Sequence, residues 1–337
     1  MQFRLYKLQF TAPCHFGDGE TSADLAGSGT TCFSDTLVSA LFLEYLALYG
    51  EEIAKQFINA LQNGLLRFSD LFPYIGDSDT LFLPRPQLIS QKRIDRTEFP
   101  IEEIKRGMQV AKKVKRVEYI PEYLYTQYIE RIQAGQVSAF FKEDASLEEL
   151  TVPIAKQAYT RVAIQRDSDS LPYQVGTVTF QAGAGLYFIL GYEEVSLLVQ
   201  LDQVLQSLSY TGIGGKRSSG YGQFTYIVEE LTADSDYESL YEMLMAKEAN
   251  MYISLSLCVP QREDIPFMQE GAYKLIGRGG FVYSQTYADT LHKRNRYFAV
   301  KSGSTFARPL QGRVLVIEGG QHPVYRYGKG LFLGVSI

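Results

Sequence analysis

The feature that most constrains this chain is a glycine-rich loop at residues 212–222, which read GIGGKRSSGYG. Five of these eleven residues are glycine, which adopts positive φ easily and lets another backbone come close. The exposed amides of such a loop can form a concavity that binds anions. A flexible turn alone would explain the glycines, but not the two cations, two hydroxyls and one aromatic ring beside them: Lys216, Arg217, Ser218, Ser219 and Tyr221. This composition predicts a site for a nucleic-acid backbone, with Tyr221 as a surface for base stacking.

A nucleotide-binding P-loop is the main alternative, and its spacing is not met. That motif requires G-x-x-x-x-G-K-[ST] opening directly into a helix, whereas Lys216 is followed here by Arg217, and the position five before Gly215 is not glycine. Residues 194–209 carry an apolar stripe with helical spacing, and residues 223–228 alternate polar and apolar as a strand does. The loop is therefore predicted to join a helix to a strand, the reverse of a P-loop, which argues against ATP or GTP hydrolysis.

With its flanking helix and strand, the loop resembles the signature of the RAMP superfamily of CRISPR proteins, in which a G-x-G-G-K-R-S-S-G-[YF]-G segment occupies this position. Within that superfamily the chain is most similar to the fourth-subunit family of the type III-A (Csm) interference complex. The resemblance spans nearly the whole chain, and further segments agree with it in order and spacing: residues 15–17, 34–41, 81–86 and 301–306.

This resemblance implies an α+β fold built from two ferredoxin-like (RRM-like) domains with antiparallel sheets. We place the first domain at residues 1–231, with an insertion at about 90–150, and the second at 232–337. Residues 232–236 form the polar break between them.

Hydrophobic periodicity predicts the individual elements. Ser34 is expected to be the N-cap of a helix that ends at about residue 49, because Gly50 favours a helix stop. The other expected helices lie at 51–61, 194–209 and 237–247. The expected strands lie at 2–10, 69–75, 81–83, 159–165, 173–180, 186–190, 223–229, 251–259, 271–276, 281–285, 296–301, 313–317 and 331–337.

Composition limits the classes of function. With 337 residues, of which 45% are hydrophobic, the chain is long enough for two domains with substantial cores. The net charge of −5 argues against nucleic-acid binding over the whole surface and leaves room for a local basic groove. The three cysteines are widely spaced and odd in number, which favours a reduced cytoplasmic setting over disulfides or a metal site. No apolar run reaches the roughly 18 residues of a membrane span, and no signal peptide is evident.

The few histidines decide whether this chain is read as an enzyme. His15 follows the first predicted strand, where some RAMP endoribonucleases carry a general base, so a metal-independent ribonuclease that processes CRISPR RNA is the alternative function. The preferred interpretation is that His15 contacts RNA or caps that strand. His292 lies in a basic loop that suits a phosphate contact or a solvated surface, and His322 precedes a proline in a turn and is expected to be structural. The acidic residues give no metal-ligand pattern, so neither a metal nor a cofactor is predicted.

Three further basic segments leave alternatives open. Residues 105–116 can be a solvated helix face, a clamp on guide RNA or a contact for a neighbouring subunit. Arg161 and Arg166 flank a predicted strand and could reach RNA. Residues 301–305, KSGST, suit either phosphate contact or a simple turn between strands, and their position in the family favours phosphate contact.

Taken with the resemblance, these observations predict a non-catalytic RNA-binding subunit of a prokaryotic antiviral CRISPR complex. The family implies that it binds the 5′ repeat-derived tag of CRISPR RNA and links the large polymerase-like subunit to the backbone RAMP subunits, with no contact to a membrane. A module that binds only proteins is a weaker alternative. The predicted RNA-binding residues are His15, Phe16, Ser34, Arg161, Gly212, Gly214, Gly215, Lys216, Arg217, Ser218, Ser219, Gly220, Tyr221, Lys301, Ser302, Gly303 and Ser304.

Overall fold

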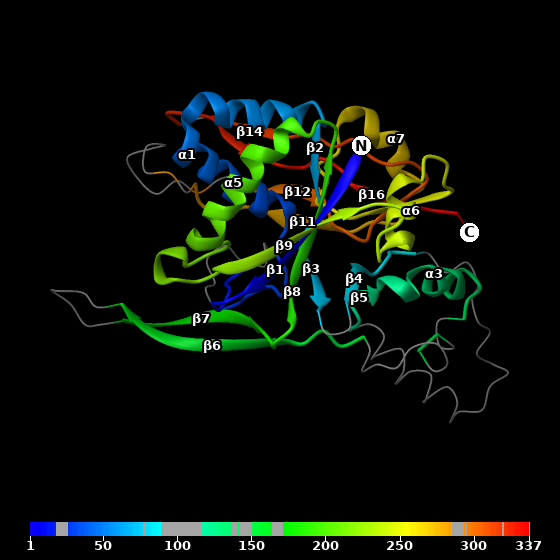
Figure 1. Cartoon of the computed structure of the whole chain (residues 1–337), viewed down its shortest axis with the longest axis horizontal. Helices are drawn as coiled ribbons and strands as arrows, with labels where there is room; N and C mark the ends of the chain where they lie inside the picture. Colours follow the sequence, from blue (N-terminus) through cyan, green and yellow to red (C-terminus); the bar gives the residue numbers. More distant parts are fainter. Residues whose placement is uncertain are drawn as a thin grey trace.

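The computed structural model describes most of the chain: residues 1–17, 26–76, 79–88, 116–136, 140–141, 150–163, 171–282, 284, 293, 295–318 and 320–336. Its centre is an antiparallel sheet in which the strands follow the order β5-β4-β3-β8-β1-β9, with β2 also paired to β8 (Figure 1). The strands of this sheet are β1 (Gln2–Phe10), β2 (Leu66–Phe68), β3 (Phe72–Ile75), β4 (Thr80–Pro84), β5 (Tyr119–Pro121), β8 (Ala184–Tyr192) and β9 (Phe224–Leu231).

The two central strands, β1 and β8, are buried on both faces over most of their length. Every residue of β8 is buried, which explains its nearly continuous apolar sequence, whereas β1 also carries polar residues. Tyr6 of β1 pairs with Phe188 of β8, and both side chains face the long helices α1 (Ser34–Gln62) and α5 (Ser196–Thr211). Leu5 pairs with Ile189 on the opposite face, where α3 (Tyr125–Gln133) and α6 (Glu238–Met245) contribute to a second core. The sheet is therefore the middle layer of the molecule.

Two segments form sheets separate from the central one. The strands β6 (Ile154–Ala163) and β7 (Leu171–Phe180) form a long hairpin outside the main sheet (Figure 1). The C-terminal part carries three small antiparallel sheets, β13-β10-β16, β11-β12 and β14-β15. Its elements are β10 (Met251–Ser254), η5 (Arg262–Asp264), α7 (Ile265–Met268), β11 (Leu275–Arg278), β12 (Tyr297–Val300), β13 (Thr305–Phe306), β14 (Leu315–Ile317), β15 (Val324–Arg326) and β16 (Phe332–Val335).

The class predicted from the sequence, α+β with antiparallel sheets, is confirmed, and so are most of the long elements. The first strand has the predicted bounds, and Gly50 (φ 77°) interrupts α1 where a helix stop was expected. The proposed N-cap is wrong: the helix begins at Ser34 itself, and the Asp70 carboxylate accepts the Ser34 amide at 2.8 Å. The division at residue 232 and the two ferredoxin-like folds stay predictions.

Other predicted elements have different bounds in the structure, and some predicted residues fall outside the described part of the chain. The predicted strand 251–259 is shorter, since β10 ends at Ser254, although the Leu255 amide still donates to the Leu331 carbonyl at 2.8 Å in the same register. Residues 105–115, Arg166 and His292 lie outside the described part of the chain, as do residues 283 and 285 of the predicted strand at 281–285. Within that strand, Phe281 forms an isolated bridge with Lys293.

Candidate RNA-binding site

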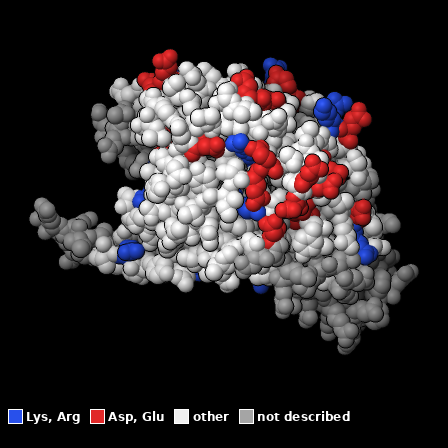
Figure 2. All heavy atoms as spheres, viewed as in Figure 1, with Lys and Arg blue, Asp and Glu red and all other residues white. Residues whose placement is uncertain are grey.

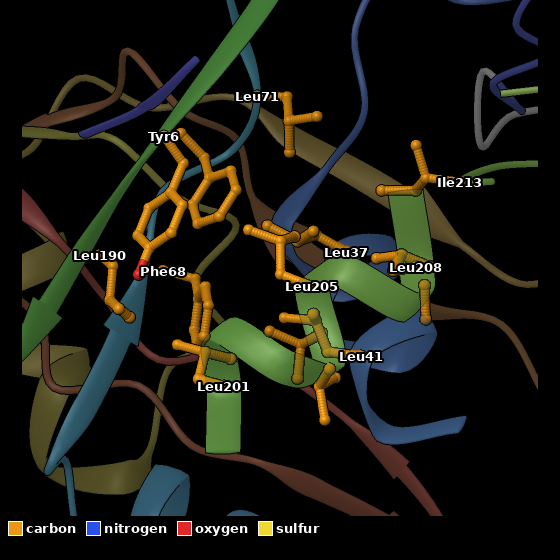
Figure 3. Close-up of a cluster of buried hydrophobic side chains, with 14 of the residues drawn as sticks. Tyr6, Leu37, Leu41, Phe68, Leu71, Leu190, Leu201, Leu205, Leu208 and Ile213 are labelled. Carbon is orange, nitrogen blue, oxygen red and sulfur yellow. The ribbon is translucent and has the colours of Figure 1, made fainter. Parts of the chain in front are cut away.

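The two ends of the glycine-rich loop, residues 212–213 and 221–222, meet at what we call its neck. The neck is held closed by backbone contacts and by one buried side chain. Ile213 points into the core formed by α1 and α5 (Figure 3), and it is fully buried. Its amide donates to the carbonyl oxygen of Gly222 at 3.0 Å. A Cβ atom at Gly222 would overlap the Ile213 carbonyl, and one at Gly212 would overlap the Tyr221 carbonyl. The first and last glycines are thus required because two backbone segments meet here.

The middle of the loop packs on the segment that follows β1. The Gly215 amide donates to the His15 carbonyl at 2.8 Å, and the Gly222 amide donates to the Pro13 carbonyl at 2.9 Å. A Cβ atom at Gly214 would lie 2.6 Å from the same His15 oxygen. The structure therefore brings together two of the segments that the sequence singled out, the loop and residues 15–16.

Three backbone amides of the loop remain as donors. Those of Gly214, Lys216 and Ser218 make no hydrogen bond to any residue that the structure describes. Lys216 adopts the left-handed conformation (φ 59°), which is uncommon for a residue with a side chain. The loop continues into a short 3-10 turn, η4 (Arg217–Ser219), whose two serines are exposed. Unbonded amides around a left-handed residue are the arrangement that binds phosphate oxygens.

The β6–β7 hairpin supplies the neighbours of the loop cations. The Lys216 Nζ atom lies 4.9 Å from the centre of the Tyr173 ring on β7. Arg161 of β6 donates from Nη2 to the Tyr221 hydroxyl at 3.2 Å, which raises the pKa of Arg161 above its ordinary value. Because Arg161 and Tyr173 are directly paired across the hairpin, both project toward the loop. Tyr173 is a site residue that the sequence analysis missed, since nothing in the spacing of 173 and 216 links them.

Tyr221 does not have the role expected from the sequence. Only 7% of it is exposed, and its hydroxyl is occupied by Arg161. Its face is therefore covered by the protein, and it cannot stack on a base in this structure. The reason is the closed neck of the loop, which draws Tyr221 inward beside Gly222.

The positive charge of Arg217 is partly compensated by a carboxylate inside the protein. Its Nη1 atom lies 3.8 Å from the Oε1 atom of Glu44, a buried residue of α1. The Glu44 carboxylate also accepts the hydroxyls of Ser207 at 2.6 Å and Thr211 at 2.7 Å. Arg217 thus ties the loop to both helices, and Lys216 and Arg161 are the cations that remain better placed for a ligand.

His15 and Phe16 support the loop from beneath. The His15 Nδ1 atom lies 2.7 Å from the Gly176 carbonyl oxygen, and its ring is packed against Gly215. Phe16 is 2% exposed, and its ring packs against Gly214. Both side chains are buried, so the structure gives them a scaffolding role. Ser34 is also fully buried, and its hydroxyl accepts the Leu257 amide at 3.2 Å, which removes it from the residues that can reach RNA in this structure.

The second predicted loop, at 301–304, is only partly accessible. Gly303 (φ 84°) approaches the Arg85 carbonyl, and its amide donates to Ser254 at 2.7 Å. Ser304 is fully buried, and its hydroxyl donates to the Lys301 carbonyl at 2.6 Å. Lys301 and Ser302 are half-buried and are the members of this loop that can reach a ligand.

The described residues include no cluster of His, Cys, Asp or Glu side chains that could hold a metal ion. Among the helices that the structure describes, none has the length and apolar character to cross a membrane.

Comparison with known proteins decides the family. The family model for the CRISPR Csm4 C-terminal domain matches residues 247–335. A curated relative from Mycobacterium tuberculosis (strain CDC 1551 / Oshkosh), the "CRISPR system Cms protein Csm4", is 30% identical over 343 residues, which cover 99% of this chain and 98% of the relative. This chain belongs to the Csm4 family. The Csm4 protein of Streptococcus thermophilus is 27% identical over 344 residues and all of both chains.

Solved structures of Csm4 share the fold. A chain of a "Csm3-Csm4 subcomplex in the type III-A CRISPR-Cas interference complex" matches with a TM-score of 0.65 and 19% identity over all of both chains. A chain of a "Csm1-Csm4 cassette in complex with pppApA" matches with a TM-score of 0.58 and 18% identity over 100% of this chain and 99% of the other. The resemblance to the type III-A fourth-subunit family is thereby confirmed.

Proposed function

We propose that this Csm4-family chain is a non-catalytic subunit that binds the 5′ repeat-derived tag of CRISPR RNA at the glycine-rich loop. The observation that carries the proposal is the group of unbonded amides at Gly214, Lys216 and Ser218, placed beside the cations Lys216 and Arg161. The amides would hold phosphate oxygens, while the cations neutralise the backbone charge. Selectivity for the tag would come from the edges of unstacked bases.

The alternative, a ribonuclease that uses His15, has less support. A general base needs a ring nitrogen that reaches the 2′-hydroxyl of the substrate. The Nδ1 atom of His15 is engaged with the Gly176 carbonyl, and the ring edge is packed against Gly215. Incubation of repeat RNA with the full chain in EDTA tests this directly, because cleavage that disappears in His15→Ala would establish the ribonuclease.

We further propose that the chain links the large subunit to the backbone subunits. The similar solved structures, a Csm3–Csm4 subcomplex and a Csm1–Csm4 cassette, support this arrangement. On this chain, Arg4 and Lys7 are outnumbered by the acids they contact, which are Asp79, Asp202, Glu229 and Glu230. Figure 2 shows acidic side chains gathered on this face. Because such a face repels RNA, it suits a protein partner.

The edge of the central sheet offers a second reason to place a protein there. Strand β9 ends the sheet and pairs only with β1 within the described chain. Ile227 is 63% exposed on this strand, and Val228 is also exposed. Exposed edge strands with apolar side chains are natural pairing sites for another chain.

The fold assignment that the family implies is part of the proposal. The elements β1, α1, β3, β8, α5 and β9 follow one another with the strand order β3-β8-β1-β9. This succession supports a β-α-β-β-α-β, ferredoxin-like first domain at residues 1–231. A second ferredoxin-like domain at 232–337 is proposed on the resemblance alone.

Salt dependence of binding tests the RNA site. Replacement of one phosphate-contacting cation on single-stranded RNA reduces the slope of log K against log salt by about 0.7. We expect Lys216→Ala to weaken binding of tagged RNA and to show this reduced slope. Lys55→Ala, which removes an exposed cation of α1 that contacts Glu51, is the matched control. If both variants bind with the wild-type affinity and slope, the loop is not the RNA site.

A further inference from the structure

The two-stranded sheet β11-β12 has one buried face and one open face. Ile276 and Ala299 are paired and buried, and Arg278 lies on the same inner side. On the outer side, Gly277 is paired with Phe298, whose side chain is 60% exposed, and Leu275 is exposed nearby. A large aromatic ring is therefore presented to solvent on the flat side of a sheet.

One cation lies over this ring, and another is exposed just before the neighbouring strand. The Arg296 guanidinium lies 5.7 Å from the centre of the Phe298 ring and rests across Gly277, where a Cβ atom would overlap it. Lys274 is exposed beside Leu275, and its carbonyl accepts the Lys301 amide at 2.9 Å, which joins this face to the loop at 301–304.

The sequence of this region is basic in an acidic chain. Residues 271–306 contain six Lys and Arg residues, of which Arg278 is buried in a pair with Asp35, and one acid, Asp289, whereas the whole chain has a net charge of −5. Asp289 lies outside the described residues. A local excess of positive charge favours the binding of a polyanion. A protein partner fits less well, because Lys is depleted in the cores of protein–protein interfaces.

We infer that the outer face of β11-β12 is a stacking platform for an unpaired base of single-stranded RNA. Phe298 stacks on the base, while Arg296 and Lys274 contact the flanking phosphates. A base on an aromatic ring is a sequence-tolerant contact, because every base has a π face. The inference rests on the proposed function, since the platform serves the RNA that the glycine-rich loop holds.

The chain carries a matched pair that serves as a control. Phe267 of α7 is also exposed and also has an arginine over its ring, Arg308 at 5.6 Å. Its hollow is lined by three acids, Glu248, Glu263 and Asp264, and by two cations, Lys247 and Arg308, so the local charge is slightly acidic where that of the platform is basic. RNA is therefore expected to use Phe298 and to avoid Phe267.

Equilibrium binding of an unstructured oligoadenylate RNA to the full chain tests the platform. We expect Phe298→Ala to weaken binding roughly 5- to 150-fold, which corresponds to the loss of one base–aromatic stack, with an unchanged salt slope. Phe298→Trp should retain affinity, and Phe267→Ala should bind as the wild type does. A 2-aminopurine in the RNA should be quenched by the wild type and by Phe298→Trp, and less by Phe298→Ala.

The outcomes separate the two proposals. If the wild-type chain binds no RNA, both the proposed function and the platform are overturned. If the wild type binds and Lys216→Ala weakens it, but Phe298→Ala matches Phe267→Ala, only the platform is overturned. If Phe298→Ala retains RNA affinity and quenching yet loses association with a partner protein, the face is a protein interface and the inference is wrong.

Discussion

At the scale of single residues, the most constrained contact is a buried ion pair between Asp35 and Arg278. Asp35 lies in the first turn of α1, and Arg278 lies at the end of β11. The two make a bidentate pair, Nη2 to Oδ1 at 2.8 Å and Nε to Oδ2 at 3.0 Å, and the Tyr297 hydroxyl donates to Oδ2 at 2.9 Å. Burial lowers the pKa of Arg278, and Asp35 more than restores it, so the arginine stays charged.

Removal of one partner of this pair is predicted to be costly. Asp35→Ala leaves the Arg278 charge buried without its carboxylate and should lower the free energy of unfolding by about 3–5 kcal/mol. The double variant Asp35→Leu with Arg278→Met should lose less, because it leaves no uncompensated charge. Urea denaturation measures both. Equal losses in the single and double variants would show that the charge pairing is not the cause.

A second buried acid makes stability depend on pH. Burial raises the pKa of Asp70 above its ordinary 3.8, although the amides of Ser34 and Leu257 act in the other direction. The folded chain therefore holds this proton more tightly than the unfolded chain, and the stability contributed by protonated Asp70 is lost as the pH rises above about 3.8 through the native pKa.

Comparison with Asp70→Asn isolates this effect. The variant has no titrating group at this position. Its free energy of unfolding relative to that of the wild type should therefore rise as the pH is raised above the ordinary aspartate value. This difference, called the gap below, should become constant above the native pKa of Asp70. Unfolding free energies of both proteins across the acidic range measure the gap. A gap that does not change with pH would contradict the prediction.

Several residue roles could not be predicted from the sequence. Ser34 and Tyr221 have the right chemistry for RNA contact, but burial, which depends on residues far along the chain, decides what each can touch. Asp70 takes the place at the N-terminus of α1 that Ser34 was expected to fill. Tyr173 enters the site only because the β6–β7 hairpin folds onto the loop.

At the scale of elements, the neck of the glycine-rich loop is the decisive piece. Gly220 and Gly222 have similar positive φ values, 79° and 75°, but differ in surroundings. A Cβ atom at Gly220 meets open space, whereas one at Gly222 overlaps the Ile213 backbone. Gly220 therefore requires glycine only for its positive φ, whereas Gly222 also requires it because the Ile213 backbone lies so close.

Alanine substitutions at these two positions should differ in effect. Gly220→Ala is expected to cost about 1–2 kcal/mol, the penalty of a side chain in the left-handed region. Gly222→Ala should cost more and should also weaken RNA binding, because the neck must open. Thermal unfolding and RNA titration of both variants measure this. Equal effects of the two variants would contradict the closed neck.

The sequence predicted long elements better than short ones. The helix before the loop and the strand after it follow from strong periodicity, and both are present as α5 and β9. Strands β13 and β15 have two and three residues, too few for a recognisable alternation, and neither was predicted. Such strands form because a partner strand is nearby in the fold, not because of local sequence preference.

At the scale of the whole molecule, charge is divided between surfaces. The acidic face over β1 and β9 and the cations around the glycine-rich loop occupy different parts of the fold (Figures 1 and 2). The net charge of −5 conceals this division, which would allow an acidic chain to bind RNA at a local basic site. RNA and protein partners are therefore expected to bind at separate sites.

Crosslinking of tag RNA within the purified complex tests the central claim most directly. Photoreactive nucleotides placed along the 5′ tag should crosslink to peptides from residues 212–222 and from the adjacent hairpin, including Arg161 and Tyr173. Crosslinks of the tag to other parts of this chain or only to other subunits, with none in these peptides, would contradict the account.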